Sequence, residues 1–132
     1  FGLTAGLRWL CDRFKQRTGI IVEFQSTFEG RTADETETHL FRIAQEALTN
    51  VARHAKATRV EVSLANVGGQ IRLRIADNGT GVVTEQSRPN HGLGMVGMRA
   101  RARSAGGELK VDTAPGQGVD ILASFPFIAP KE

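Results

Sequence analysis

Hydrophobic residues recur at helical spacing in three stretches of the chain, with polar residues on the opposite side of each. The stretches cover residues 3–17, about 37–55 and 95–105. Gly19 and Gly106-Gly107 follow the first and the third, where helices commonly end. Thr36 or Thr38 is a candidate N-cap for the second. The pattern therefore predicts three amphipathic helices.

Shorter stretches are typical of strands, the first by its β-branched content and the others by alternation of apolar and polar residues. They are residues 20–25, 60–64, 71–75, 109–111 and 119–125. Asn66-Val67-Gly68-Gly69 joins the second and third into an antiparallel hairpin, and the turn 113–118 joins the last two into another. Residues 127–132 are expected to form a short tail.

The order helix, strand, helix, hairpin, helix, hairpin predicts an α/β fold of two layers. Strands with one apolar face need a single covering layer, which three helices can supply. We therefore expect a two-layer sandwich, in which three helices cover one face of a mixed, mostly antiparallel sheet. A chain of 132 residues suffices for one domain, residues 1–132. Because it starts at Phe1 with a helical pattern under way by Leu3, we expect a fragment of a longer protein.

Composition narrows the classes of function only modestly. Hydrophobic residues make up 40% and charged residues 23%, which is ordinary for a folded domain, and no apolar run reaches membrane-spanning length. The net charge of +3 is a slight bias toward anionic ligands such as phosphates. The arginines lack neighbouring aromatic residues for base stacking, so we expect no nucleic-acid partner. Cys11 is the one cysteine, which excludes an internal disulfide.

Polar side chains that could bind a cation or a ligand lie on one side of the second predicted helix. Glu46, Asn50 and His54 are four residues apart, so a helix places them on a common face away from the apolar stripe. A carboxylate and an amide one turn apart can jointly hold a hydrated divalent cation. A helix with a merely solvated face has the same pattern, so this stretch alone leaves both interpretations open.

Two glycine motifs follow downstream. Asp77-Asn78-Gly79-Thr80-Gly81 ends the third predicted strand and places glycines beside a carboxylate, although a plain turn has the same composition. The polar segment 82–90 predicts a mobile loop, and His91-Gly92-Leu93-Gly94 leads from it into the third helix. This order predicts a glycine-hinged lid that feeds a helix N-terminus, where anions bind favourably.

Three motifs in this order resemble the catalytic ATP-binding domain of bacterial two-component sensor histidine kinases, in the subclass of the nitrate-sensor and DesK-like kinases. The family calls them the N, G1 and G2 boxes of the Bergerat fold, which it shares with gyrase and MutL. The resemblance extends from the first helix to Pro126. The motifs are Gln45-Glu46-Ala47-Leu48-Thr49-Asn50-Val51 with His54-Ala55, Asp77-Asn78-Gly79-Thr80-Gly81, and Gly92-Leu93-Gly94-Met95-Val96-Gly97-Met98-Arg99 leading to Gly106-Gly107.

The resemblance implies that this chain binds ATP with Mg²⁺. Asn50 would ligate the Mg²⁺ that bridges the phosphates, and Glu46 would orient or activate groups at the γ-phosphate. Asp77 would accept a hydrogen bond from the adenine amino group, while Gly79 and Gly81 let the backbone approach the base. An ATP lid over residues 82–94 is implied. The remaining nucleotide-binding positions are Arg53, His54, His91, Gly92, Leu93, Gly94, Met95 and Val96.

The resemblance also implies partners. The γ-phosphoryl group would pass to a histidine on a separate dimerisation domain of the same protein, and then to a response regulator. The kinase would be a dimer, with this portion cytoplasmic and the whole protein membrane-anchored, whereas the fragment alone would be monomeric. None of His39, His54 and His91 precedes an acidic residue, as the family's phosphoacceptor histidine typically does, so the acceptor is expected outside this chain.

One further departure concerns the last glycine turn. The family usually has Gly-x-Gly-Thr, whereas this chain has Gly116-Gln117-Gly118-Val119. We expect the turn to form and any contact of the threonine hydroxyl to be lost. A second hypothesis is a regulatory interaction module, similar to an anti-sigma factor or a degenerate kinase, that binds ATP without transferring phosphate.

Overall fold

The computed structural model describes residues 2–80, 91–113 and 116–130. The helices are α1 (Leu3–Thr18), α2 (Asp34–Asn50) and α3 (His91–Ser104), and a π-helical segment, η1 (Val51–Ala55), directly continues α2. The strands are β1 (Ile21–Ser26), β2 (Arg59–Val67), β3 (Gln70–Asp77), β4 (Glu108–Thr113) and β5 (Val119–Pro126).

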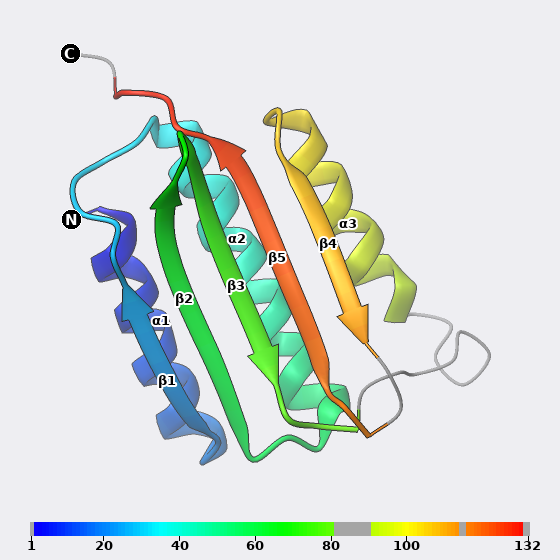
Figure 1. Ribbon diagram of the computed structural model, residues 1–132. Helices are drawn as coiled ribbons and strands as arrows, with labels where there is room; N and C mark the ends of the chain where they lie inside the picture. The colour runs from blue at the N-terminus through cyan, green and yellow to red at the C-terminus, as the bar shows by residue number, and fades with distance from the viewer. Residues whose placement is uncertain (1, 81–90, 114–115, 131–132) are drawn as a thin grey trace.

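The five strands form one sheet in the order β1-β2-β3-β5-β4. β1 and β2 are parallel, and every other neighbouring pair is antiparallel. All three helices lie on one face of this sheet (Figure 1). The predicted two-layer α/β sandwich with a mixed, mostly antiparallel sheet is therefore confirmed, as are both predicted hairpins.

The hydrophobic core lies between the helices and the sheet, because each element has one apolar side. The helices contribute Leu7, Phe14, Leu40, Ile43 and Ala102, and the strands contribute Val60, Val62, Leu64, Ile71, Leu73, Ala123 and Phe125. Alternate strand residues point away from this core, and many are charged, as in Arg74, which pairs with Asp120. One face of the sheet is thus buried and the other solvated, as an antiparallel sheet permits.

Cys11 is part of the core, as the spacing of its neighbours predicts. It is 3% exposed, and burial is the main cause that raises the pKa of its thiol to about 12. A thiol in this environment is protonated and unreactive at neutral pH. In the described part of the chain, no helix combines the length and the apolar character required to span a membrane.

The prediction that Thr36 or Thr38 caps the second helix is wrong. The helix α2 starts at Asp34 with Ala33 at its N-cap, and Thr36 is buried inside the first turn. No side chain caps this helix start, and the Glu37 carboxylate instead accepts a hydrogen bond at 3.0 Å from the backbone N–H of Thr32, which precedes the helix. Negative charge near the first turn is also favourable for the helix dipole.

The end of this helix differs from the regular α-helix that the sequence predicts. After Asn50 the backbone widens into the π-helical η1, and Lys56 then takes a left-handed conformation with φ 49°. A π-helical turn holds more residues than an α-helical one, so it rotates later side chains out of the expected line. The spacing argument that aligned His54 with Glu46 and Asn50 therefore does not apply beyond Asn50.

The helix α3 starts at His91, four residues before the predicted start at Met95. Residues 91–94, which were predicted to be lid, are helical here, and residues 82–90 of the predicted lid lie outside the described residues. The predicted end is confirmed, because the Gly107 N–H donates to the Ala102 carbonyl oxygen at 2.8 Å and Gly106 has φ 79°. Met98 is 2% exposed, so it belongs to the core.

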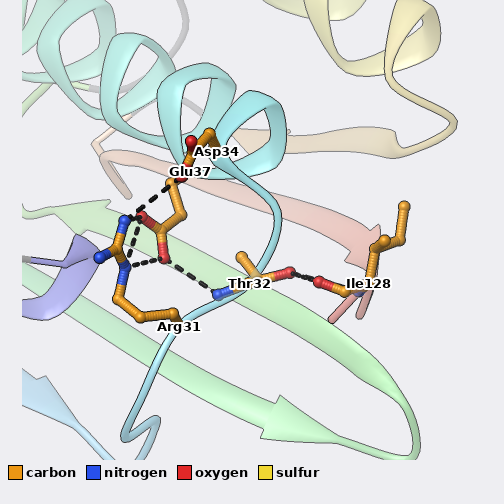
Figure 2. A network of polar contacts seen from close by, with 5 residues as sticks. All are labelled: Arg31, Thr32, Asp34, Glu37 and Ile128. Carbon is orange, nitrogen blue, oxygen red and sulfur yellow. Dashed lines mark hydrogen bonds and ion pairs between the residues drawn. The ribbon is translucent and has the colours of Figure 1, made fainter. Parts of the chain in front are cut away.

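Residues 127–130 form neither helix nor strand, and the first of them are hydrogen-bonded to the rest of the domain. The Phe127 N–H donates to the Gly69 carbonyl oxygen at 2.9 Å. The buried Thr32 hydroxyl donates to the Ile128 carbonyl oxygen at 2.7 Å, beside the Arg31–Glu37 ion pair (Figure 2). Buried Thr32 requires a hydrogen-bond partner, and the backbone of Ile128 supplies it.

Candidate functional site

The predicted site residues gather at one end of the sheet. The C-terminal end of α2, the C-terminal end of β3 and the start of β5 all lie at the lower end of the molecule in Figure 1. Sheet register contributes to this arrangement, because Ala76 of β3 pairs with Asp120 of β5. The next residues along, Asp77 and Val119, are consequently neighbours.

Asp77 is the titratable group at the centre of this end. Its carboxylate oxygen Oδ1 accepts a hydrogen bond from the Gly79 N–H at 2.8 Å. Burial raises the pKa of this carboxyl, while hydrogen bonds from the Gly79 and Val119 amides act in the opposite direction. A half-buried carboxylate that two amides orient, with no cation as partner in the described residues, is a candidate for accepting a hydrogen bond from a ligand.

The turn between β4 and β5 packs directly on Asp77. Gly118 has φ 78°, and a Cβ atom added there would lie 2.8 Å from the carbonyl carbon of Asp77 and 3.1 Å from its Oδ1. The Gly116 N–H donates to the Thr80 carbonyl oxygen at 2.8 Å. The turn forms, as predicted, although Val119 stands where the family usually has threonine. The sequence did not predict that Gly118 touches Asp77.

Asn50 and Glu46 lie one turn apart on α2, and both are partly exposed. The Asn50 side-chain nitrogen Nδ2 is buried and has no hydrogen-bond partner among the described residues. An unpaired buried amide is costly unless a ligand or a water satisfies it. Asn50 therefore has the features of a ligand-contacting residue, whereas the structure gives no contact that tests the role of Glu46.

These residues fit a magnesium ion that is bound mainly by a nucleotide. No group of three or more His, Cys, Asp or Glu residues that could hold a metal occurs in the described residues. Mg²⁺ commonly takes only one or two protein oxygens and completes its shell with phosphate oxygens and water. The amide oxygen of Asn50 is a suitable donor of this kind.

Other predicted site residues are less well placed by the structure. Arg53 lies in η1 and is exposed. Gly79 is buried in the loop after β3. Gly81 and the side chain of His54 lie outside the described residues. His91, Gly92, Leu93, Gly94, Met95 and Val96 form the start of α3, and only their backbone is described.

Asn78 belongs to the second motif, but neither the residue pattern nor the resemblance assigns a role to its side chain. Its Oδ1 accepts hydrogen bonds from the Thr58 N–H at 2.9 Å and the Arg59 N–H at 3.0 Å. Its Nδ2 donates to the Thr58 hydroxyl at 2.9 Å. The side chain thereby joins the loop after β3 to the segment between η1 and β2. No local pattern indicates this, because the partners are far apart in sequence.

A comparison with protein families identifies the class of domain. The family described as "Histidine kinase-, DNA gyrase B-, and HSP90-like ATPase" matches residues 35–129, which include Asn50, Asp77 and Gly118. The chain belongs to this ATPase family. The resemblance that its three motifs indicate is therefore confirmed at the level of the family.

Curated relatives of this ATPase domain are sensor kinases. It is 38% identical over 131 residues to the sensor histidine kinase LiaS of Bacillus subtilis, a match to 99% of this chain and 36% of the relative. It is 36% identical over 128 residues to the signal transduction histidine-protein kinase/phosphatase DegS of Brevibacillus brevis, covering 96% and 33%. The chain thus spans about a third of the length of these relatives.

Solved structures agree on the fold. The blue-light activated histidine kinase EL346 of Erythrobacter litoralis superimposes with a TM-score of 0.81 at 25% sequence identity, covering 96% of this chain and 42% of that chain. The mycobacterial sensor histidine kinase MprB, at 24% identity, matches with a TM-score of 0.72 over 98% of this chain and 97% of that chain. The ATPase domain therefore has the fold of histidine-kinase ATPase domains.

Proposed function

We propose that this ATPase domain binds ATP with Mg²⁺ and transfers the γ-phosphoryl group to a histidine on a dimerisation domain of the same protein. The observation that carries the proposal is the pair of unusual polar groups at one end of the sheet. Asp77 is a half-buried carboxyl that two amides orient, and the buried Nδ2 of Asn50 has no hydrogen-bond partner within residues 2–80, 91–113 and 116–130. Relatives that are named as sensor histidine kinases support the reaction class.

The adenine base would be recognised at Asp77. A carboxylate accepts hydrogen bonds only, so it favours the exocyclic amine of adenine and disfavours the carbonyl oxygen of guanine at the same position. Gly118 allows the β4–β5 turn to pack directly on the backbone of Asp77, and Gly79 has no side chain that would compete with a flat base. Gly81 is proposed to contribute to the same wall.

The phosphates would lie toward the end of α2. Asn50 is proposed to ligate Mg²⁺, which neutralises charge on the phosphate oxygens when it is bound. Glu46, one turn earlier, is proposed to orient the groups that meet at the γ-phosphate. Arg53, His54 and the backbone amides at the start of α3 would supply further contacts to anionic oxygens. The rest of the predicted lid, residues 82–90, is proposed to close over them.

The transfer itself requires little covalent chemistry from this chain. A nitrogen of the acceptor imidazole would attack the γ-phosphorus, the bond from phosphorus to the β,γ-bridging oxygen would break, and ADP would leave. The domain would contribute by holding the nucleotide in line with the acceptor and by stabilising charge. We further propose that the intact kinase is a membrane-anchored dimer with this domain in the cytoplasm, and that a response regulator receives the phosphate.

Two measurements test the proposed function. Calorimetric titration with ATP, with and without Mg²⁺, tests nucleotide binding. Incubation with γ-labelled ATP and a separately supplied dimerisation domain tests transfer, with a variant of that domain lacking its phosphoacceptor histidine as control. We expect label on the supplied domain only when Mg²⁺ and the histidine are both present. Tight ATP binding without transfer to any supplied domain would instead favour a regulatory ATP-binding module.

A further inference from the structure

We propose that Asn78 is a positioning residue for nucleotide recognition, which holds the Asp77 carboxyl in register with the helix end that carries Asn50. This inference rests on the proposed function. Asn78 would not touch the nucleotide and would act through its neighbour Asp77. It is distinct from every residue to which the resemblance assigns a contact with ATP or Mg²⁺.

Both the oxygen and the nitrogen of the Asn78 side-chain amide form hydrogen bonds. The oxygen Oδ1 accepts from the backbone N–H groups of Thr58 and Arg59, at 2.9 Å and 3.0 Å. The nitrogen Nδ2 donates to the Thr58 hydroxyl at 2.9 Å. Three hydrogen bonds from one side chain to two adjacent residues fix its position far better than a single bond does.

Backbone contacts extend this anchor in both directions. The Asn78 N–H donates to the Arg59 carbonyl oxygen at 3.2 Å, so the main chain of the same loop joins the same segment. The Thr58 carbonyl oxygen accepts from the Ile21 N–H at 3.0 Å, which ties the segment to the start of β1. Asn78 is therefore attached to a part of the backbone that is itself held on two sides.

Thr58 and Arg59, to which Asn78 is hydrogen-bonded, follow shortly after the proposed magnesium ligand in the chain. Asn50 ends α2, η1 follows, and Lys56 reverses the chain in a left-handed conformation before Thr58. Asp77 immediately precedes Asn78, so the position of one limits the position of the other. The Asn78 amide thus couples the base side of the site to its phosphate side.

The test compares Asn78→Ala with Asn78→Asp and Asn66→Ala. Asparagine 66 is an exposed residue of β2, so Asn66→Ala controls for loss of an amide at a distant site. Asn78→Asp keeps an oxygen that can accept from both amides and from the Thr58 hydroxyl. Affinities for ATP and GTP are measured by calorimetry, and the melting temperature of each variant is measured alongside.

We expect Asn78→Ala to lower the ratio of ATP affinity to GTP affinity by about tenfold, equal to about 1.4 kcal/mol of selectivity. Asn78→Asp should recover most of this ratio, and Asn66→Ala should leave it unchanged. A lower melting temperature with an unchanged ATP to GTP ratio would overturn the inference, because Asn78 would then serve stability alone. Failure of the unmodified domain to bind ATP would overturn the proposed function itself.

Discussion

The backbone of Gly118 lies against the backbone of Asp77 so closely that no side chain fits between them. A Cβ atom on Gly118 would lie 2.8 Å from the carbonyl carbon of Asp77, within the range that nonbonded atoms do not occupy. The contact arises because β5 pairs with β3 in a register that brings the start of one strand to the end of the other. The β4–β5 turn therefore forms part of the proposed adenine pocket.

Gly118→Ala should displace Asp77 and lower ATP affinity by more than about tenfold, which corresponds to a loss of about 1.4 kcal/mol of binding free energy. The matched control is Gly116→Ala. Both glycines have positive φ, so both variants carry a similar backbone strain, but a Cβ on Gly116 meets no atom within 4 Å. Calorimetric titration with ATP checks the difference, and equal affinities for the two variants would contradict it.

Asn50→Ala should abolish Mg²⁺-dependent ATP binding while the fold remains intact. The buried Nδ2 of Asn50 has no hydrogen-bond partner among the described residues, so truncation removes no bond of Nδ2 to that part of the chain. We expect a melting temperature that is unchanged or slightly higher. Titration with ATP in the presence and absence of Mg²⁺ measures the effect, with Asn50→Asp as a variant that retains an oxygen donor. Unchanged nucleotide affinity in Asn50→Ala would refute the ligand role.

Asp77→Asn should remove the preference for ATP and leave the melting temperature at pH 7 equal or higher. Burial raises the pKa of Asp77 above 3.8 in the folded state, so the folded protein binds this proton more tightly than the unfolded chain. The ionised carboxyl therefore lowers the free energy of unfolding above its folded pKa, and this cost disappears as the pH falls below the unfolded value.

The same shift predicts how binding depends on pH. In the unmodified domain, ATP affinity should decline as the pH falls through the raised pKa of Asp77, because a protonated carboxyl accepts more weakly from adenine. Melting curves and titrations of both proteins between about pH 4 and pH 8 test the two trends. Asp12→Asn, on the exposed side of α1, is the control for removal of a surface charge. A clearly lower melting temperature for Asp77→Asn at pH 7 would contradict the sign.

Glu37→Ala should destabilise the fold without an effect on ATP affinity. Glu37 accepts from Arg31 and from the buried Thr32 N–H, and its loss leaves that amide unsatisfied at a cost of about 1–3 kcal/mol. Glu35→Ala is the matched control, because Glu35 lies in the same helical turn with a side chain that is 79% exposed. Thermal unfolding measures the difference. A change in ATP affinity would contradict the prediction, because it would show that the N-terminal end of α2 affects nucleotide binding.

The predicted helices and strands are found in the structure because local periodicity determines each of them. Alternation of apolar and polar residues predicts the strands of the two hairpins, and the turns between them predict their pairing. The apolar stripe of α2 predicts the face of the helix that is buried. Errors occur at the boundaries of elements. The helix α2 begins at Asp34, ahead of both threonines that were predicted to cap it, and its end widens into the π-helical η1 before Lys56 turns left-handed.

The sequence by itself therefore determined the class of fold, the family motifs and the candidate residues, Asn50 and Asp77 among them. Only the tertiary structure decided which residues meet Asp77 and what supports it. Gly118 and Asn78 acquire their roles from contacts with segments far along the chain. Such contacts depend on sheet register and on the path of the backbone after α2, and neither is encoded in the local spacing of residue types.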